Sequence, residues 1–123
     1  MRVLVVEDEL LIRWSIAQTL ADAGHTVIEA NDAASAIVAV TDATPAVDVV
    51  LLDYRLPDSD DLSLLANIQR ISPRSTVILM TAHGTPDVIE GALELGACAV
   101  LHKPFDLHGL IDILVSARQS RPD

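Results

Sequence analysis

The stretch that decides the fold is VVLLDYRLPDSD, residues 49–60. Its first four residues are apolar without any polar alternation, which predicts a strand buried on both faces of a parallel sheet. The strand then runs directly into Asp53, although an unpaired charge is costly to bury. A carboxylate in this place indicates that the strand ends at a site where the charge has a chemical use.

The composition indicates one globular domain. The 123 residues are enough for a hydrophobic core, and half of them are apolar while only 2% are aromatic, so Val, Leu, Ile and Ala must build it. The single cysteine, Cys98, cannot form an internal disulfide, so we expect the protein to lie in a reducing, cytoplasmic compartment. We expect Cys98 itself to be a small buried apolar residue. The formal charge of −10 disfavours nucleic-acid binding by this domain. We also expect no signal peptide and no membrane span.

Short apolar runs alternate with segments of helical periodicity on both sides of the central run. The expected strands are residues 3–6, 26–29, 47–52, 76–80 and 99–102. The expected helices are residues 10–21, 33–40, 64–71, 86–95 and 107–115. Three residues are the expected N-caps and two glycines the expected helix stops, namely Asp32, Thr85, Asp106, Gly24 and Gly96.

This alternation predicts an α/β, flavodoxin-like, doubly wound (βα)5 fold. The expected parallel sheet has the order 2-1-3-4-5 with helices on both faces. In such a sheet the carboxyl ends of the strands lie along one edge, and ligands bind where the first and third strands separate. We expect the domain to span residues 1–119, with residues 120–123 as a polar tail or the start of a linker.

Side chains that could take part in chemistry follow four of the five expected strands. Glu7 and Asp8 follow the first strand, Asp53 the third, Thr81 the fourth and Lys103 the fifth. Any one of them could simply mark a strand end. Because all of these strands end at the same edge, we expect the five residues to converge on one site.

The chemistry of this group points to phosphoryl transfer. Three neighbouring acids repel one another, so either a pKa rises or a cation lies between them. Oxygen ligands with room for water favour Mg²⁺ over Ca²⁺. The central acid, Asp53, is the candidate nucleophile toward phosphorus. Thr81 would then donate a hydrogen bond to one phosphoryl oxygen and Lys103 would pair with another.

Four runs, in this order over nearly the whole chain, resemble the receiver domain of bacterial two-component response regulators. They are VLVVEDE (3–9), LLDYRLP (51–57), ILMTAHG (78–84) and LHKPFD (101–106). The resemblance implies that Asp53 is phosphorylated by the phosphohistidine of a sensor histidine kinase or phosphotransfer protein. It implies a Mg²⁺ held by Asp53, by Asp8, by the backbone carbonyl of Arg55 and, through water, by Glu7. It also implies a cis peptide between Lys103 and Pro104.

The resemblance further implies a cytoplasmic signalling switch rather than an enzyme, although receivers assist their own phosphorylation and dephosphorylation. Phosphorylation would rearrange the face built from residues 86–95, 99–102 and 107–115. That face would control a partner or an output domain, for which a transcriptional role is expected, and could form a phosphorylation-dependent homodimer. Alternatives are a stand-alone phosphorelay receiver, a degenerate receiver used only for binding, and an aspartyl-phosphate phosphatase. The last would need an acid two residues after Asp53, where this chain has Arg55.

Two positions depart from the receiver pattern. Asp61 replaces the usual glycine eight residues after the phosphoacceptor. We expect it to face solvent and to make the same turn at slightly higher strain, since Asp tolerates a left-handed backbone and can also cap a helix. Val100 replaces the usual aromatic residue three positions before the lysine. Because valine is too short to swing between surface and interior, we expect the signal to pass chiefly through the backbone of residues 81–85 and the start of the helix expected at residues 86–95.

The sequence says less about the roles of three further residues. We expect Trp14 to pack against the domain rather than to contact a kinase. Arg55 and His83 either flank the phosphate site, where they would tune hydrolysis, or are exposed loop residues.

Overall fold

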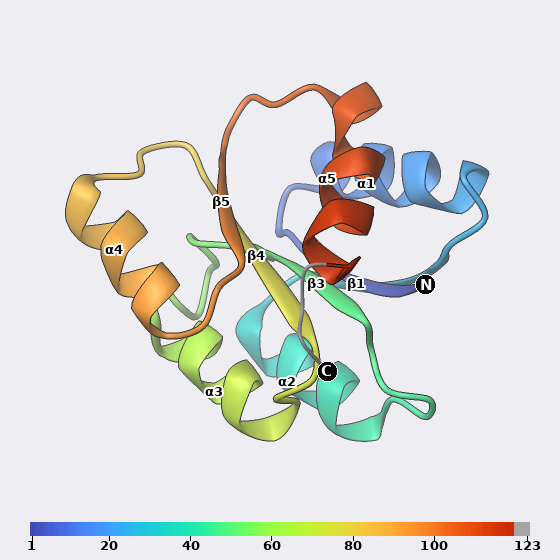
Figure 1. Cartoon of the computed structure of the whole chain (residues 1–123). Helices are drawn as coiled ribbons and strands as arrows, with labels where there is room; N and C mark the ends of the chain where they lie inside the picture. The colour runs from blue at the N-terminus through green and yellow to red at the C-terminus, as the bar shows by residue number, and fades with distance from the viewer. Residues whose placement is uncertain (120–123) are drawn as a thin grey trace.

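The computed structural model describes residues 1–119, and the expected tail at residues 120–123 lies outside this part of the chain. The strands are β1 (Arg2–Val6), β2 (Thr26–Ala30), β3 (Val49–Asp53), β4 (Thr76–Thr81) and β5 (Ala99–His102). The helices are α1 (Leu10–Asp22), α2 (Ala33–Asp42), α3 (Ser63–Ile71), α4 (Pro86–Glu94) and α5 (Leu107–Gln119). The sheet is parallel with the order β2-β1-β3-β4-β5, so the predicted flavodoxin-like α/β fold is confirmed (Figure 1).

Helices cover both faces of the sheet, as Figure 1 shows with α1 and α5 on one side and α2 and α3 on the other. Successive strand residues point to opposite faces, so each strand supplies two cores. In β3, Val49 and Leu51 join the core under α1 and α5. Val50 and Leu52 join the core under α2, α3 and α4. This double burial explains why the central run is apolar without alternation.

The register of the sheet aligns the strand ends that carry the polar residues. Asp53, the last residue of β3, lies beside Met80 of β4, and Thr81 lies beside His102 of β5. All residues of β3 and β4 are buried, so the core holds the two strands that end in Asp53 and Thr81 firmly in place.

The helix ends follow the sequence signals. The side chains of Asp32, Thr85 and Asp106 accept hydrogen bonds from backbone N–H groups in the first turns of α2, α4 and α5. Gly24 and Gly96, which follow α1 and α4, have φ angles of 91° and 106°. A side chain would strain the backbone there, which is why glycine ends these helices.

The buried face of α1 differs from the expectation for Trp14. Within this helix Ile16 and Leu20 are buried, whereas Leu10, Leu11 and Trp14 are 66%, 77% and 58% exposed. The expectation that Trp14 packs against the domain was therefore wrong. The first half of α1 carries apolar residues on more than one face, and only one of these faces meets the sheet.

Cys98 and Asp61 also lie differently from the expectation. Cys98 is exposed rather than buried, because it belongs to the connection that precedes β5. Asp61 faces solvent as expected, but no non-glycine residue among residues 1–119 has a positive φ. Asp61 instead accepts a hydrogen bond from the backbone N–H of Ser63 at 2.9 Å and so stabilises the start of α3 without a left-handed backbone.

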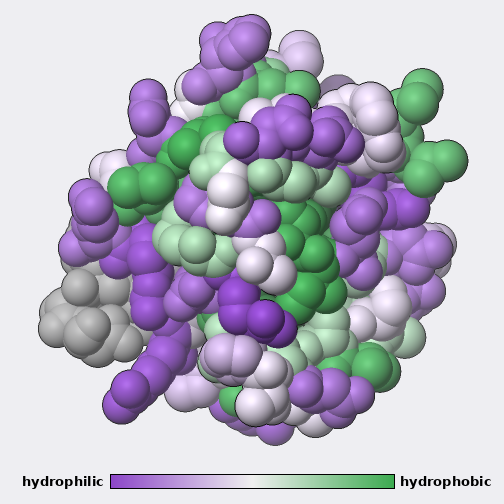
Figure 2. All heavy atoms as spheres, turned by 90° about the vertical axis from the view of Figure 1, so that its right-hand side faces the viewer, coloured by the Kyte–Doolittle hydropathy of each residue, from purple (hydrophilic) through white to green (hydrophobic). Residues whose placement is uncertain are grey.

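The surface mixes charged and apolar residues. Figure 2, which shows the right-hand side of Figure 1, has hydrophilic residues over much of this face and apolar residues in separate groups between them. Within residues 1–119, no helix has the length and apolar character needed to cross a membrane.

Candidate functional site

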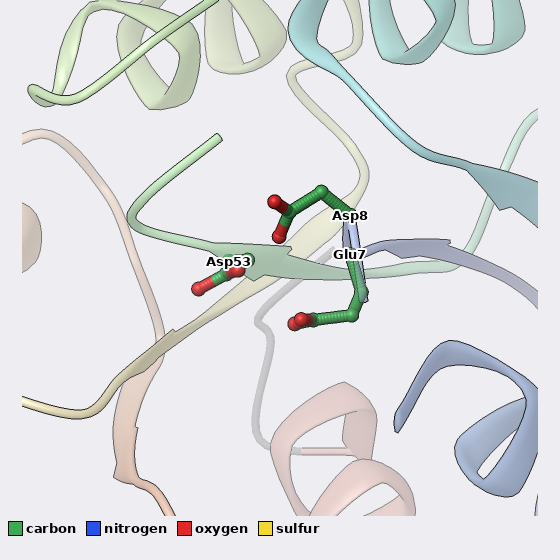
Figure 3. A group of neighbouring side chains, drawn as sticks. All are labelled: Glu7, Asp8 and Asp53. Carbon is green, nitrogen blue, oxygen red and sulfur yellow. The ribbon is translucent and has the colours of Figure 1, made fainter. Parts of the chain in front are cut away.

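Three carboxylates converge at the carboxyl edge of the sheet. Glu7 and Asp8 directly follow β1, and Asp53 ends the neighbouring strand β3. Each contributes one oxygen, and these oxygens all lie within 4.8 Å of one another (Figure 3). Glu7 is 0% and Asp53 7% exposed, while Asp8 is exposed. The structure thus brings together the three acids that the sequence reasoning selected.

Lys103 joins this cluster from the end of β5. Its Nζ lies 2.7 Å from an oxygen of Glu7 and 3.2 Å from Oδ1 of Asp53. Its backbone N–H donates to the carbonyl of Thr81 at 2.8 Å, which fixes where the long side chain begins. The peptide between Lys103 and Pro104 is cis, as the resemblance implied. The ammonium therefore partly offsets the repulsion between two buried acids.

The burial of the cluster changes its proton affinities. Desolvation raises the pKa of Glu7 to about 7, reinforced by the charge of Asp53 and opposed by the hydrogen bond from Lys103. Burial alone would lower the pKa of Lys103, but its hydrogen bond to Glu7 and the charges of Asp53 and Glu7 outweigh burial and raise that pKa. Lys103 is thus a permanent cation at neutral pH, and Glu7 is the acid whose ionisation is costly.

An open cavity of about 390 Å³ lies in front of Asp53. Thr81, only 3% exposed, is on its wall, and the threonine hydroxyl accepts a hydrogen bond from the backbone N–H of His83 at 3.2 Å. The hydroxyl proton remains for an acceptor inside the cavity. Arg55 and His83 also line this cavity, so both lie where they can meet a group that enters it.

The donor set fits a small divalent cation. All of its side-chain donors are carboxylate oxygens, which Mg²⁺ prefers, and Asp8 and Asp53 line the cavity, where water has room. When the three acids are ionised, Lys103 leaves the cluster with two uncompensated negative charges. Such a site attracts a doubly charged ion.

The loop after Thr81 is closely packed against β5. A Cβ atom on Gly84 would lie 2.9 Å from Cγ2 of Thr81 and 3.0 Å from Cε1 of His102, so a side chain there would force Thr81 or His102 to shift. Val100, by contrast, is half-buried and packs against the core under α2, α3 and α4. The contact of the loop with Thr81 therefore runs through backbone atoms, whereas Val100 is held in the core.

Sequence reasoning missed two side chains that support the site. Arg13 of α1 donates to the backbone carbonyl of Glu7. Asp58, in the loop after β3, accepts hydrogen bonds from the backbone N–H groups of Ala33 and Ala34 at 2.7 and 3.1 Å. Both contacts join segments distant in the sequence, so no local pattern could reveal them.

Comparisons with known proteins agree with this site. The profile of the response regulator receiver domain matches residues 3–115. The DNA-binding transcriptional regulator NtrC of Escherichia coli K12 is 38% identical over 115 residues, which are 94% of this chain and 24% of NtrC. Sporulation initiation phosphotransferase F of Bacillus subtilis is 33% identical over 111 residues, which cover 90% of this chain and 88% of that protein. The chain thus spans about a quarter of the length of NtrC but most of the length of the phosphotransferase.

Solved structures show the same fold. A CheY-like receiver domain protein from Methanospirillum hungatei JF-1 superposes with a TM-score of 0.91 at 24% identity, over 96% of this chain and 93% of that one. NtrX from Brucella abortus has a TM-score of 0.87 at 36% identity, over 97% of this chain and 27% of NtrX. With the profile match over nearly its whole length, the chain belongs to the response regulator receiver domain family.

Proposed function

We propose that this domain is a phosphoacceptor switch rather than an enzyme, and that it receives a phosphoryl group on Asp53 from a phosphohistidine. The observation that carries this proposal is the pairing of Asp53 with Lys103 at 3.2 Å, inside an acid cluster that opens into a cavity. A structural ion pair would need neither the cavity nor two further carboxylates beside it.

In the proposed reaction, one oxygen of Asp53 forms a bond to phosphorus as the bond from phosphorus to the histidine nitrogen breaks. The imidazole keeps the electron pair of that bond. Lys103, already 3.2 Å from Asp53, pairs with a phosphoryl oxygen and offsets its charge. The Thr81 hydroxyl donates a hydrogen bond to another phosphoryl oxygen. The rigid strand β3 holds the Asp53 carboxylate in place throughout.

The residues proposed to hold Mg²⁺ are Asp8 and Asp53 directly, Arg55 through its backbone carbonyl, and Glu7 through water. Glu7 is already engaged by Lys103 at 2.7 Å, which suits an indirect role. When bound, Mg²⁺ would neutralise negative charge on the incoming phosphoryl oxygens.

Phosphorylation by a small donor tests this proposal. Incubation with acetyl phosphate and Mg²⁺ should add one phosphoryl group in intact-mass spectra, and chelation of Mg²⁺ should abolish it. Asp53→Asn should not be labelled. Asp60→Asn, the same change in an exposed acid of the following loop, is the matched control and should be labelled like the wild type. Undiminished labelling of the Asp53 variant would contradict the assignment.

We further propose that the phosphodonor, a histidine kinase or a phosphotransfer protein, docks on the exposed start of α1. Leu10, Leu11 and Trp14 are exposed there. Leu11, Phe105 and Lys103 line the same apolar cavity of about 500 Å³. Because Lys103 also belongs to the acid cluster, the apolar surface continues to the edge of that cluster. An exposed apolar surface beside the site suits a protein donor.

The docking proposal predicts different results for protein phosphodonors and for small phosphodonors. Trp14→Ala should slow phosphoryl transfer from a phosphorylated histidine phosphotransfer protein but leave labelling by acetyl phosphate unchanged. Val38→Ala removes a similarly exposed apolar side chain from α2, at 57% exposure, and should slow neither reaction. Equal slowing of both reactions by Trp14→Ala would point to a damaged site rather than a docking surface.

We propose a cytoplasmic location and an output through the face formed by α4, β5 and α5, which would control a partner or a further domain. The name of NtrC as a DNA-binding transcriptional regulator supports a transcriptional output, and the length match to the sporulation phosphotransferase supports a phosphorelay role. A phosphorylation-dependent homodimer through this face is part of the proposal. Sedimentation of the protein with and without beryllofluoride, a mimic of the phosphoryl group, tests that part.

A further inference from the structure

The turn that carries Glu7 and Asp8 must hold two carboxylates close to a third. Their mutual repulsion favours a turn that opens and moves the acids apart. The side chain of Glu7 is restrained by Lys103, but Asp8 is exposed. The position of Asp8 therefore depends on how firmly the backbone of this turn is held.

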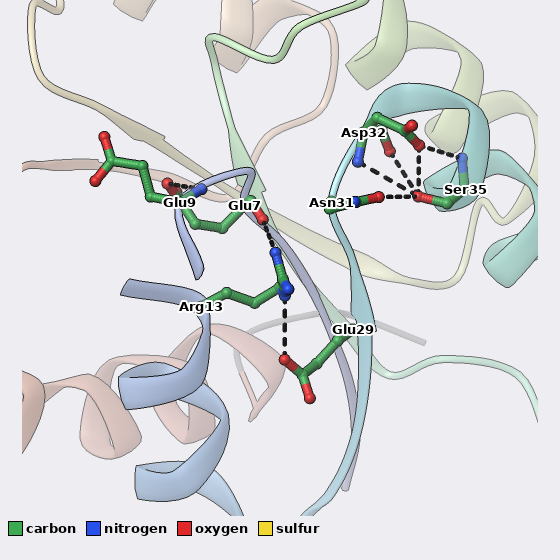
Figure 4. A network of polar contacts seen from close by, with 7 residues as sticks. All are labelled: Glu7, Glu9, Arg13, Glu29, Asn31, Asp32 and Ser35. Atoms are coloured by element: carbon green, nitrogen blue, oxygen red, sulfur yellow. Dashed lines mark hydrogen bonds and ion pairs between the residues drawn. The ribbon is translucent and has the colours of Figure 1, made fainter. Parts of the chain in front are cut away.

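Arg13, one turn into α1, reaches back to this backbone. Its Nη1 donates to the carbonyl oxygen of Glu7 at 2.9 Å, and its Nε donates to Oε1 of Glu29 at 3.2 Å (Figure 4). The Arg13 side chain is only 16% exposed. A planar guanidinium that uses two nitrogens on two partners has little freedom, so the contact is directional.

Strand β2, which supplies one partner of Arg13, also holds the turn directly. Glu29 is a residue of β2, and the next residue, Ala30, accepts a hydrogen bond from the backbone N–H of Glu7 at 3.0 Å. The peptide groups on both sides of Glu7 are thus fixed, one by Ala30 and the other by Arg13. The carbonyl held by Arg13 belongs to the peptide that leads into Asp8.

We propose that Arg13, oriented by Glu29, is a positioning residue that holds the turn of Glu7 and Asp8 in the arrangement that binds the divalent cation. This inference rests on the proposed function of the acid cluster as a Mg²⁺ site. Arg13 touches neither the cation nor the phosphoryl group. It acts on the backbone to which the ligands are attached.

Charge and position predict opposite results when Arg13 is removed. A positive guanidinium near the cluster repels a cation, so its loss should tighten Mg²⁺ binding if only Coulomb forces act. If Arg13 holds the turn, its loss should weaken Mg²⁺ binding, because part of the binding free energy is then needed to close the turn. The sign of the change therefore distinguishes the two roles.

The experiment is calorimetric titration of the unphosphorylated protein with Mg²⁺. Arg13→Gln should weaken binding by about tenfold, as changes next to metal ligands commonly do. Arg13→Lys keeps the charge but not the two-pronged contact, and it should resemble Arg13→Gln. Arg118→Gln is the matched control, because Arg118 also donates to a backbone carbonyl, that of Arg74 at 2.9 Å, and pairs with an acid, Asp48 at 3.6 Å. These contacts lie at the opposite edge of the sheet, so Mg²⁺ affinity should not change.

Unchanged or tighter Mg²⁺ binding by Arg13→Gln would overturn the inference, and so would wild-type affinity of Arg13→Lys, which would show that the charge acts alone. An equal loss of affinity in Arg118→Gln would reduce the effect to general stability and also overturn it. Acetyl phosphate labelling at saturating Mg²⁺ separates this inference from the proposed function. If the wild type is labelled and the Arg13 variants bind Mg²⁺ normally, only the positioning role is wrong.

Discussion

Replacing Glu7 by Gln should stabilise the metal-free protein much more at alkaline pH than at acidic pH. Burial raises the pKa of Glu7 from 4.5 to about 7, so the unfolded chain releases this proton at a lower pH than the folded chain does. Between these values the folded state binds more protons, and the free energy of unfolding falls as the pH rises. The stabilising contribution is complete below pH 4.5 and is lost as the pH passes about 7.

The size of the effect follows from the difference between the two pKa values. A change from 4.5 to about 7 corresponds to about 3 kcal/mol, at ~1.4 kcal/mol for each tenfold change in proton affinity. Glutamine has nearly the same shape as the protonated acid and still accepts a hydrogen bond from Lys103. Lys103 also keeps Asp53 as an ionic partner, at 3.2 Å. Glu7→Gln therefore removes the cost of ionisation without leaving an unpaired ammonium.

Urea denaturation in a chelator, followed by circular dichroism, gives the measurement. The free energy of unfolding of Glu7→Gln minus that of the wild type should be about 1 kcal/mol at about pH 5 and about 3 kcal/mol at about pH 8. Glu90→Gln, the same change at an exposed site of α4, should give equal differences at both pH values. If the Glu7 variant is equally or less stable than the wild type at the higher pH, the buried acid is not the source of strain.

Three further changes test other contacts. Asp8→Asn should raise the free energy of unfolding in a chelator by about 1 kcal/mol, since charges about 4 Å apart in water repel by that amount; a lower urea midpoint would contradict this. Asp58→Ala should lower the free energy of unfolding by about 1 kcal/mol, as the loss of a helix cap does, because Asp58 accepts two backbone N–H groups at the start of α2. Asp60→Ala is its control and should be neutral in the same denaturation assay. Beryllofluoride should shift amide resonances of residues 82–91 more than that of Val100, and an equal response of β5 would refute a backbone route.

The pattern along the chain was enough to predict the fold and the members of the acid cluster. Buried strands, helix caps and glycine stops are local properties, so their positions could be read within a residue or two at most ends. The convergence of Glu7, Asp8, Asp53, Thr81 and Lys103 followed from one topological rule, that parallel strands end at the same edge. The start of β3 was missed, because Val47 is buried like a strand residue but precedes the strand.

Only the tertiary structure decided which surfaces are exposed and which distant groups meet. Leu11 and Trp14 could not be assigned to the outside from periodicity, because the start of α1 is apolar on more than one face and the sheet covers just one. The contact of Arg13 with Glu7 and Glu29 depends on how α1 crosses the end of β2. Burial and the charge of Asp53 raise the pKa of Glu7, and Lys103, almost a hundred residues away in the sequence, limits the rise. Periodicity reports how each segment meets its immediate surroundings, whereas these contacts arise from the packing of whole elements against one another.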